Sequence, residues 1–406
     1  MHHPASFGLV VLLLSSGAAA VPSASPLPFN PGFDIEKVLS LAQSLPSHSW
    51  EFGTAAEALL ELYDPSISVF GSSPFPPRKV SADTTKSLQY ASPKFQIGTA
   101  PSILVDGGGA VGDPASLGVS AVLLGQTDQM LAKAAADQLD YVINGAPRAW
   151  NGAISHRSEL VELWADFIYM APPFIAFYGA VHNKIGLLKE AVNQCSQYRQ
   201  ILRANTTKEL SGAWIHIMGD AHPDPGIWST GNAWAAAGML RVLATVQKAP
   251  ISRSDASWQK RAVLDLSNWI DEILTAAMNT PTQDGLLPNY WDDTNNEGGH
   301  GFGEISGSSL LASVAYRMAT IRPAGLSSNA AMNYIRWADG IRRALGGSDT
   351  AGNPHVTANG TATPAVNPLG WFDTQPWTAG SPEGQNFVVL MYTAWRDCVQ
   401  KGICRR

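Results

Sequence analysis

Residues 162–180 read ELWADFIYMAPPFIAFYGA, and almost every side chain in this stretch is apolar. A helix that is apolar on all faces is buried on all faces, so the stretch predicts a helix deep inside a large helical protein. One acid, Asp166, interrupts the apolar run. Burial raises the pKa of a carboxyl group, which makes Asp166 a candidate general acid. The structural alternative is an acid that caps a helix or pairs with an arginine.

Helical patterns recur along the whole chain, whereas alternating β patterns are nearly absent. Apolar residues three and four positions apart predict about eleven helices. Some, such as 158–177 and 231–248, are apolar nearly all round, and others, such as 184–204, are amphipathic. Two concentric layers of helices produce this alternation. The other predicted helices cover residues 35–45, 54–63, 114–124, 128–142, 254–278, 306–319, 329–345 and 381–398.

We therefore expect an all-α fold, with residues 34–406 forming a single domain built as a closed ring of helical hairpins. An α-solenoid has the same helix content, but no repeat of fixed length is present. Residues 71–112 contain several prolines and the run Gly107-Gly108-Gly109, so they are predicted to be loop.

The first twenty residues, MHHPASFGLVVLLLSSGAAA, are typical of a secretory signal peptide. An apolar run precedes small residues, and Ala18 and Ala20 have the A-x-A arrangement of a cleavage site. Residues 21–33 are rich in Pro and Ser and are expected to form a linker. No later stretch is long and uncharged enough to span a bilayer. These features predict a secreted, extracellular protein.

The cysteines and sequons agree with secretion. Asn205 and Asn359 each begin an Asn-x-Thr triplet and are expected glycosylation sites. Cys398 and Cys404 are close enough in sequence to form a small disulfide loop in an oxidising compartment. Cys195 is then a lone thiol, which we expect to pack in a helix interface.

The charge of the chain limits the classes of partner that it can bind. The net charge is -6, and only 15% of the residues are charged. Because no cluster of Lys and Arg is present, neither nucleic acid nor an anionic membrane is an expected partner. The chain holds 13 tryptophans, most of which are expected to fill the core. Others have the apolar ring face that stacks on sugars, so an oligosaccharide is the expected partner of a monomeric protein.

Polar and aromatic side chains gather where predicted inner helices begin or end. Loops held by a rigid helical framework are where a site is expected. The segments are Asp113–Gly118, then His156 and Arg157 with Trp164 and Asp166, then Trp214–Trp234 with His216, and Glu304–Ser309.

Four motifs in order resemble the unsaturated glucuronyl and rhamnogalacturonyl hydrolases, glycoside hydrolase families 88 and 105. They are GAISHRSELVELWADFIYMAPPFIAFYG, IWSTGNAWAAAGMLRVLAT, ISGSSLLASVAYRMA and SPEGQNFVVLMYTAW. The likeness runs from about Gly107 to Trp395 and is greatest to secreted fungal members. It implies a six-hairpin (α/α)6 barrel.

The resemblance also implies roles for individual residues. Asp166 matches the family's general acid and base, and Asp113 matches a second catalytic Asp that holds water or tunes the first. The structural alternative for Asp113 is a helix cap before Pro114. Two histidines match positions that line the sugar site, and two tryptophans match an aromatic platform. The expected substrate-binding residues are His156, Arg157, Trp164, His216, Trp228, Thr230, Asn232 and Trp234.

The sequence departs from the family at Thr230, where many bacterial members have a substrate-binding Arg. Uronate recognition then needs another cation, and Arg157 and Arg148 are the two candidates. The family's substrates carry a C4=C5 double bond left by a polysaccharide lyase, which is an enol ether. A general acid protonates C4 and water adds at C5, so one well-placed proton shuttle suffices. No cofactor is implied, and the spacings of His216, His222 and His300 match no metal-ligand pair.

Two alternatives remain open. Asp292-Asp293 lies beside aromatic residues, as acids do in other α/α-barrel glycosidases such as endo-mannanases that cleave ordinary glycosidic bonds. The second alternative is a secreted protein that binds glycans without catalysis.

Overall fold

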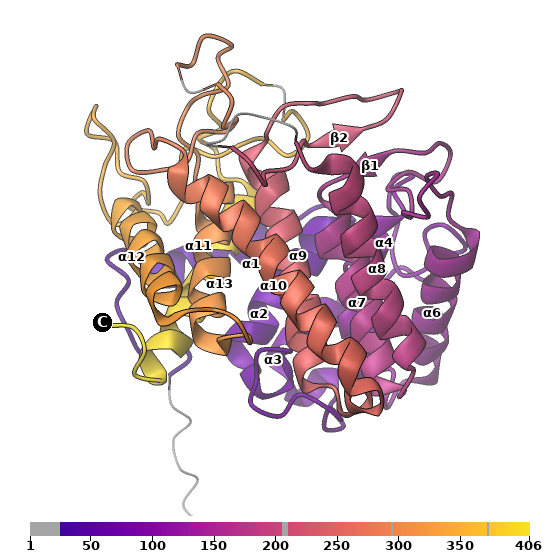
Figure 1. Cartoon of the computed structure of the whole chain (residues 1–406). Coiled ribbons are helices and arrows are strands. Elements are labelled where there is room, and N and C mark those ends of the chain that lie inside the picture. The colour runs from indigo at the N-terminus through magenta and orange to yellow at the C-terminus, as the bar shows by residue number, and fades with distance from the viewer. Residues whose placement is uncertain (1–24, 205–209, 294, 372) are drawn as a thin grey trace, which may run out of the picture.

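Helices dominate the computed structural model, which describes residues 25–204, 210–293, 295–371 and 373–406. The predicted signal peptide and the sequon at Asn205 lie outside these residues. Figure 1 shows helices packed side by side, with long loops gathered at one end together with strands β1 and β2.

The inner layer consists of helices that are buried on nearly all faces. Each packs against the next in the chain, and the last packs against the first, so they close a ring. Most of the polar and charged residues in them are buried together with the apolar ones. In the described part of the chain they are α2 (Ser49–Tyr63), α5 (Gly118–Leu124), α7 (Phe167–Val181), α9 (Ser229–Lys248), α11 (Ile305–Ile321) and α13 (Pro382–Gln400).

The outer layer consists of helices that bury one face only. Helices α3, α6, α8, α10 and α12 each pack against the inner helix that precedes them, and α1 packs against α13. They are α1 (Ile35–Ser44), α3 (Lys86–Ala91), α6 (Gln129–Asp140), α8 (Ile185–Leu202), α10 (Ala256–Asn279) and α12 (Ser328–Leu345). Two layers of alternating helices form an (α/α)6 barrel, so the predicted fold class is confirmed.

Short elements complete the chain. Strands β1 (Leu163–Trp164) and β2 (Ile217–Met218) form an antiparallel pair. Helix α4 (Gly112–Ala115) is a single turn. Turns of 3-10 helix cover Pro65–Ile67, Ala82–Thr84, Ser92–Lys94 and Pro250–Asp255, and a π-helical turn covers Tyr141–Gly145.

The structure corrects three boundaries. The helix predicted from Ser158 begins at Phe167, because residues 158–166 bond to other loops instead: Ser158 N donates to Gly109 O, and β1 pairs with β2. The segment 71–112, predicted as loop, contains α3. The helix predicted over 114–124 is split into α4 and α5. Ser116 Oγ donates a hydrogen bond to the Asp113 carbonyl at 2.6 Å, and the first turn ends there.

Helix α7 carries two prolines, Pro172 and Pro173, in its interior. A proline has no N–H, so the carbonyls one turn earlier, at Ile168 and Tyr169, lose their helical donors. Gly238 of α9 packs directly against this turn, where a Cβ would lie 2.0 Å from the Ile168 carbonyl oxygen. The glycine therefore allows α9 to approach α7 closely.

A buried ionic network joins four inner helices away from the loop end. Glu61 of α2 accepts from Arg241 of α9 at 2.6 Å and from Arg317 of α11 at 2.7 Å. Arg317 also pairs with Asp397 of α13 at 2.5 Å, and Arg241 pairs with Glu57 at 2.6 Å. Arg396 also pairs with Asp397 at 2.8 Å, so three arginines meet three carboxylates and the buried charges are balanced.

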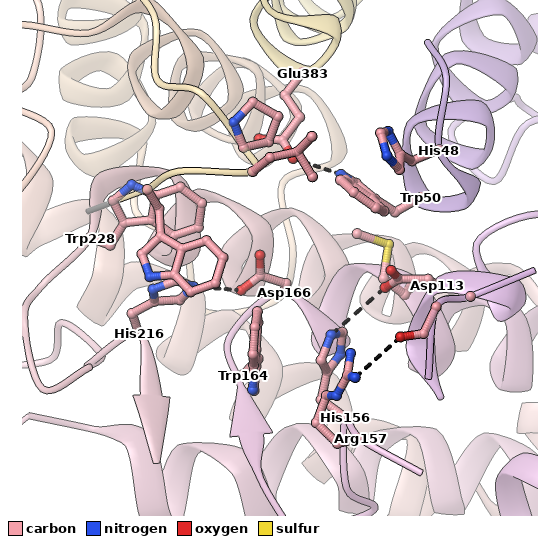
Figure 2. A pocket seen from close by; sticks show the side chains of 16 residues that line it. His48, Trp50, Asp113, His156, Arg157, Trp164, Asp166, His216, Trp228 and Glu383 are labelled. Carbon is pink, nitrogen blue, oxygen red and sulfur yellow. Dashed lines mark hydrogen bonds and ion pairs between the residues drawn. The ribbon is translucent and has the colours of Figure 1, made fainter. Parts of the chain in front are cut away.

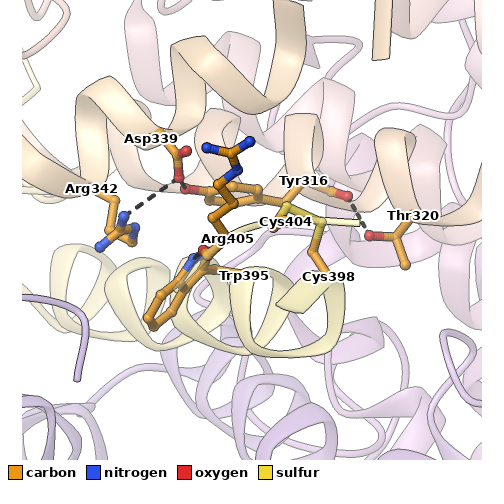
Figure 3. The surroundings of a disulfide bond; sticks show 8 residues. All are labelled: Tyr316, Thr320, Asp339, Arg342, Trp395, Cys398, Cys404 and Arg405. Atoms are coloured by element: carbon orange, nitrogen blue, oxygen red, sulfur yellow. Dashed lines mark hydrogen bonds and ion pairs between the residues drawn. A yellow bond between two sulfur atoms is a disulfide. The ribbon is translucent and has the colours of Figure 1, made fainter. Parts of the chain in front are cut away.

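A disulfide joins Cys398, in the last turn of α13, to Cys404 in the C-terminal tail (Figure 3). The tail also accepts a hydrogen bond from Trp395 Nε1 to the Arg405 carbonyl at 3.2 Å. Cys195 is a free thiol buried in α8, and burial raises its pKa well above the usual range. No helix in the described part of the chain is long and apolar enough to cross a membrane.

Candidate active site

The β1–β2 pair sets Asp166 beside His216. Trp164 of β1 lies opposite Ile217 of β2, and Ala165 N donates to the His216 carbonyl at 3.0 Å. Asp166 follows directly, at the N-terminus of α7. Its Oδ2 lies 3.3 Å from His216 Nε2. Asp166 therefore neither caps its helix nor pairs with an arginine, which were the structural alternatives for it.

The glycine run sets Asp113 beside His156. Val111 N donates to the His156 carbonyl at 2.7 Å, which joins the turn before α4 to the segment before β1. Asp113 Oδ1 then lies 3.8 Å from His156 Nε2. Gly109 has a φ of +84°, and a Cβ there would lie 2.8 Å from Arg157 Nη2, so this approach requires glycine. The Asp113 side chain caps no helix.

These side chains line one cavity of about 240 Å³ at the loop end of the barrel. Figure 2 shows Asp166 between a wall that carries His216 and Trp228 and a wall that carries Asp113 and His156. Seven of the residues expected from the sequence line it, namely Asp113, His156, Arg157, Trp164, Asp166, His216 and Trp228.

The Asp113 carboxyl has a raised pKa. Burial and the nearby charge of Asp166 raise its pKa to about 8, although Arg157 opposes the shift. Asp113 is thus protonated at neutral pH. By contrast, the side chain of Asp166 is 17% exposed, so it is open to the cavity.

The pKa values of the two imidazoles shift in opposite directions. Burial lowers the pKa of His156 to about 4, so this ring is neutral, and it stacks on Trp164 with ring centroids 4.9 Å apart. The pKa of His216 is raised, because the carboxylates of Asp166 and Asp224 outweigh its burial. His216 Nδ1 lies 2.8 Å from Asp224 Oδ2. The pKa of His156 is therefore lowered and that of His216 raised within the same cavity.

Three residues expected at the substrate lie elsewhere. Thr230, Asn232 and Trp234 are buried in α9 and do not line the cavity. Thr230 Oγ1 donates to Glu304 at 3.5 Å, and Asn232 Nδ2 donates to the Trp214 carbonyl at 2.9 Å. These side chains hold α9 and its neighbours together, so we do not assign them to substrate binding.

The structure separates the two arginines proposed to replace the family's Arg. Arg157 lines the cavity, and its Nη2 donates to the Gly108 carbonyl at 3.2 Å. Arg148 lies away from the cavity lining and is held by Glu190 at 3.2 Å and by two backbone carbonyls. Only the first is placed to meet a ligand in this cavity.

The loop with Asp292 and Asp293 uses its carboxylates within the protein. Asp292 Oδ1 accepts from Ile227 N at 3.1 Å, and Asp293 Oδ2 accepts from His300 N at 2.8 Å. Neither residue lines the cavity. Within the described residues, no three His, Cys, Asp or Glu side chains gather in a way that could hold a metal ion.

Sequence reasoning missed part of the cavity. Glu383, in the first turn of α13, lines it and accepts from Trp50 Nε1 at 2.9 Å. Burial and the charge of Asp166 raise the Glu383 pKa well above its usual range. The motif SPEGQ contains this residue, but nothing in its sequence pattern shows that the α13 and α2 ends meet. The other lining residues that the sequence did not single out are His48, Trp50, Met170, Pro368, Leu369 and Trp371, and Asp224 lies behind His216.

Comparisons with known proteins find similarity to the same two families of glycoside hydrolases. Residues 119–275 match the model of Glycosyl Hydrolase Family 88. A curated relative, the unsaturated rhamnogalacturonyl hydrolase YesR of Bacillus subtilis (strain 168), is 25% identical over 126 residues. That match spans 30% of this chain and 36% of the relative, about a third of its length.

Solved structures share the fold along most of the chain. A possible member of family GH105 from Salmonella enterica serovar Paratyphi A has a TM-score of 0.66 at 16% identity, covering 89% of this chain and 92% of that one. A family 88 glycosyl hydrolase from Bacteroides vulgatus has a TM-score of 0.60 at 14% identity, covering 89% and 96%. The resemblance to glycoside hydrolase families 88 and 105 that the motifs predict is thus confirmed, by sequence over residues 119–275 and by fold over nine-tenths of the chain.

Proposed function

We propose that this protein is a secreted glycoside hydrolase that acts on oligosaccharides with an unsaturated uronyl residue, the products of pectin or rhamnogalacturonan lyases. One observation carries the proposal: two carboxyls, Asp113 and Asp166, and two imidazoles, His156 and His216, line one aromatic cavity. The match to Family 88 and the similarity to a rhamnogalacturonyl hydrolase support the substrate class.

The proposed reaction is a hydration. Asp113 holds a proton at neutral pH, and Asp166, which is open to the same cavity, delivers a proton to C4 of the enol ether. The double-bond electrons form the new C4–H bond and leave a cationic C5. Water adds at C5 while the Asp166 carboxylate takes its proton. The resulting hemiketal opens by breaking the bond between C5 and the ring oxygen, which leaves a ketone at C5 and lets C1 release the next sugar.

We predict that activity falls as pH rises through about 8, because Asp113 then loses its proton and becomes a second negative charge in the cavity. The same shift affects stability. Between pH 3.8 and about 8 the native carboxyl keeps a proton that the unfolded chain has lost, so the free energy of unfolding decreases with rising pH over this range.

The variant Asp113→Asn tests both effects. In urea titrations, the free energy of unfolding of the wild type should fall relative to that of this variant as pH rises from 5 to about 8. In the pH profile of kcat, the variant should lack the decrease on the alkaline side. An unchanged alkaline limb in Asp113→Asn would assign the proton to another group.

Arg157 is the cation placed to bind the uronate carboxylate. A hydrogen bond between charged groups contributes about 1.5–3 kcal/mol, so Arg157→Ala should raise KM by about 10- to 100-fold with a smaller change in kcat. Arg148→Ala, away from the cavity, is the matched control and should leave KM unchanged. Equal KM values for Arg157→Ala and wild type would show that the carboxylate binds elsewhere.

Secretion rests on the N-terminal signal pattern and on the disulfide. A Cys398–Cys404 bond persists in an oxidising compartment, and Asn359 of the second sequon is exposed. Expression with residues 1–20 in a eukaryotic host, followed by mass spectrometry of the medium, would reveal the cleaved N-terminus and any glycan.

A screen of lyase-digested polysaccharides tests the substrate class. Digests of pectin, rhamnogalacturonan, ulvan and glycosaminoglycans are offered in turn, and the ultraviolet absorbance of the conjugated double bond is followed. Intact mannan is the counter-substrate, since release of sugars from it would favour an ordinary glycosidase. Binding to these glycans without turnover of any would favour the non-catalytic alternative.

A further inference from the structure

His216 lies between the carboxyl groups of Asp166 and Asp224. Its Nε2 lies 3.3 Å from Asp166 Oδ2 and its Nδ1 lies 2.8 Å from Asp224 Oδ2, while the ring is buried. The Nδ1 contact is a hydrogen bond, whereas Nε2 meets Asp166 at ion-pair distance without a hydrogen bond. A positive charge on the ring is attracted by both acids. This arrangement favours the imidazolium.

Asp224 is itself fixed in the protein. Tyr290 OH donates to its Oδ2 at 2.6 Å, and Gly226 N donates to its Oδ1 at 3.1 Å. His216 is the one cation within ion-pair distance of Asp224 among the described residues. Asp224 is therefore a buried carboxylate whose charge is balanced by the His216 ring.

The surroundings of His216 add little competing charge. Trp164, Trp228 and Trp371 pack around the ring at centroid distances of 5.9, 4.3 and 5.5 Å. The titratable groups that face it are Asp166 and Asp224, with the neutral His156 farther off. An apolar aromatic shell strengthens the attraction between the ring and its two carboxylates.

We propose that Asp224, held by Tyr290 and Gly226, is a positioning residue that keeps His216 doubly protonated, so that the charged ring holds the Asp166 side chain at ion-pair distance. The chain Tyr290–Asp224–His216–Asp166 runs from the wall of the barrel to the reacting group. The role for Asp166 rests on the proposed function, whereas the protonation of His216 does not.

The proposal has a test that needs no substrate. In 15N NMR spectra, the His216 signals are assigned by their absence in His216→Gln. In the wild type the ring should show two protonated nitrogens at pH 7. In Asp224→Asn, which removes the charge and keeps the size, it should titrate to the neutral form at a lower pH. Asp220→Asn, an exposed acid in the same loop, should leave the titration unchanged.

Tyr290→Phe separates a proton-holding role from a purely structural one. Loss of the Tyr290 hydrogen bond makes the Asp224 carboxylate a stronger base, so the imidazolium should persist to higher pH, opposite to the effect of Asp224→Asn. A structural role alone would move both variants in the same direction. A neutral His216 at pH 7 in the wild type, or an unchanged titration in folded Asp224→Asn, would overturn the proposal.

The kinetic arm measures the link to Asp166. Asp224→Asn should lower kcat by about 10- to 100-fold with little change in KM, as the loss of an orienting partner does for other imidazoles. An unaltered kcat with a shifted NMR titration would overturn the link to Asp166. Absence of turnover in the wild type would refute the proposed function and leave the NMR result as it stands.

Discussion

Replacement of Asp166 by Asn is expected to lower kcat by about 1,000-fold or more, because the variant can neither deliver a proton to C4 nor accept one from water. The fold should survive. Asp166 caps no helix, and its side chain is partly open to the cavity. Asn has the same shape and removes only the charge. The melting temperature should therefore stay close to that of the wild type.

The matched control for this variant is Asp292→Asn. Asp292 is exposed, lies outside the cavity and belongs to the loop suggested as a rival catalytic site. Its replacement should leave kcat within a few-fold of the wild type. Near-normal turnover by Asp166→Asn, or a folded but inactive Asp292→Asn, would move the catalytic acid away from α7. Titration of Asp113 adds a second readout, since loss of the Asp166 charge should lower its pKa.

Replacement of Glu61 by Gln is expected to lower the free energy of unfolding by about 3–5 kcal/mol, as the removal of one partner from a buried ion pair does. Glu61 accepts from both Arg241 and Arg317, so the variant leaves two buried guanidinium groups short of a counter-charge. Because this network joins α2, α9 and α11, the variant should destabilise the whole barrel rather than one helix. Chemical denaturation measures it.

An exposed ion pair provides the control for Glu61→Gln. Lys133 and Asp137 pair on the surface of α6 with side chains 76% and 45% exposed. Asp137→Asn should change stability by less than about 1 kcal/mol, since water already solvates both charges. An equally small effect of Glu61→Gln would show that the buried arginines find other partners.

The fold could be predicted because the sequence distinguishes helices by their faces. The run from Phe167 to Ala180 has no polar face, whereas α8 has one, and alternation of the two kinds gives two layers. The start of α7 could not be predicted. Residues 158–166 have helical periodicity, but their backbone groups bond to the glycine run and to β2, which are distant in sequence.

The site could be predicted in part. Asp166, His156 and His216 stand out as polar groups beside apolar runs, and the structure brings them to one cavity. The face of α9 that meets the cavity could not be read from the sequence, because the rotation of a helix that is buried all round is set by its neighbours. For this reason Thr230 and Trp234 were expected at the substrate but lie in the core.

Residues that reach the site only through tertiary contacts have no local sequence pattern that predicts them. Asp224 and Tyr290 are 66 positions apart, and only the fold joins them behind His216. Trp50 and Glu383 come from the two ends of the chain and meet because α13 packs against α2 to close the ring. A closed barrel assembles its cavity from every hairpin, so residues such as these emerge only from the structure.

The most direct test of the central claim is a paired assay on a pectin or rhamnogalacturonan lyase digest. Ultraviolet absorbance reports the C4=C5 bond, and a reducing-sugar assay reports release of the next sugar. Hydration by Asp166 predicts that both change together, one double bond lost for each sugar released, and that neither changes with Asp166→Asn. Sugar release that leaves the double bond intact, or no loss of absorbance with any lyase digest, would contradict the proposed function.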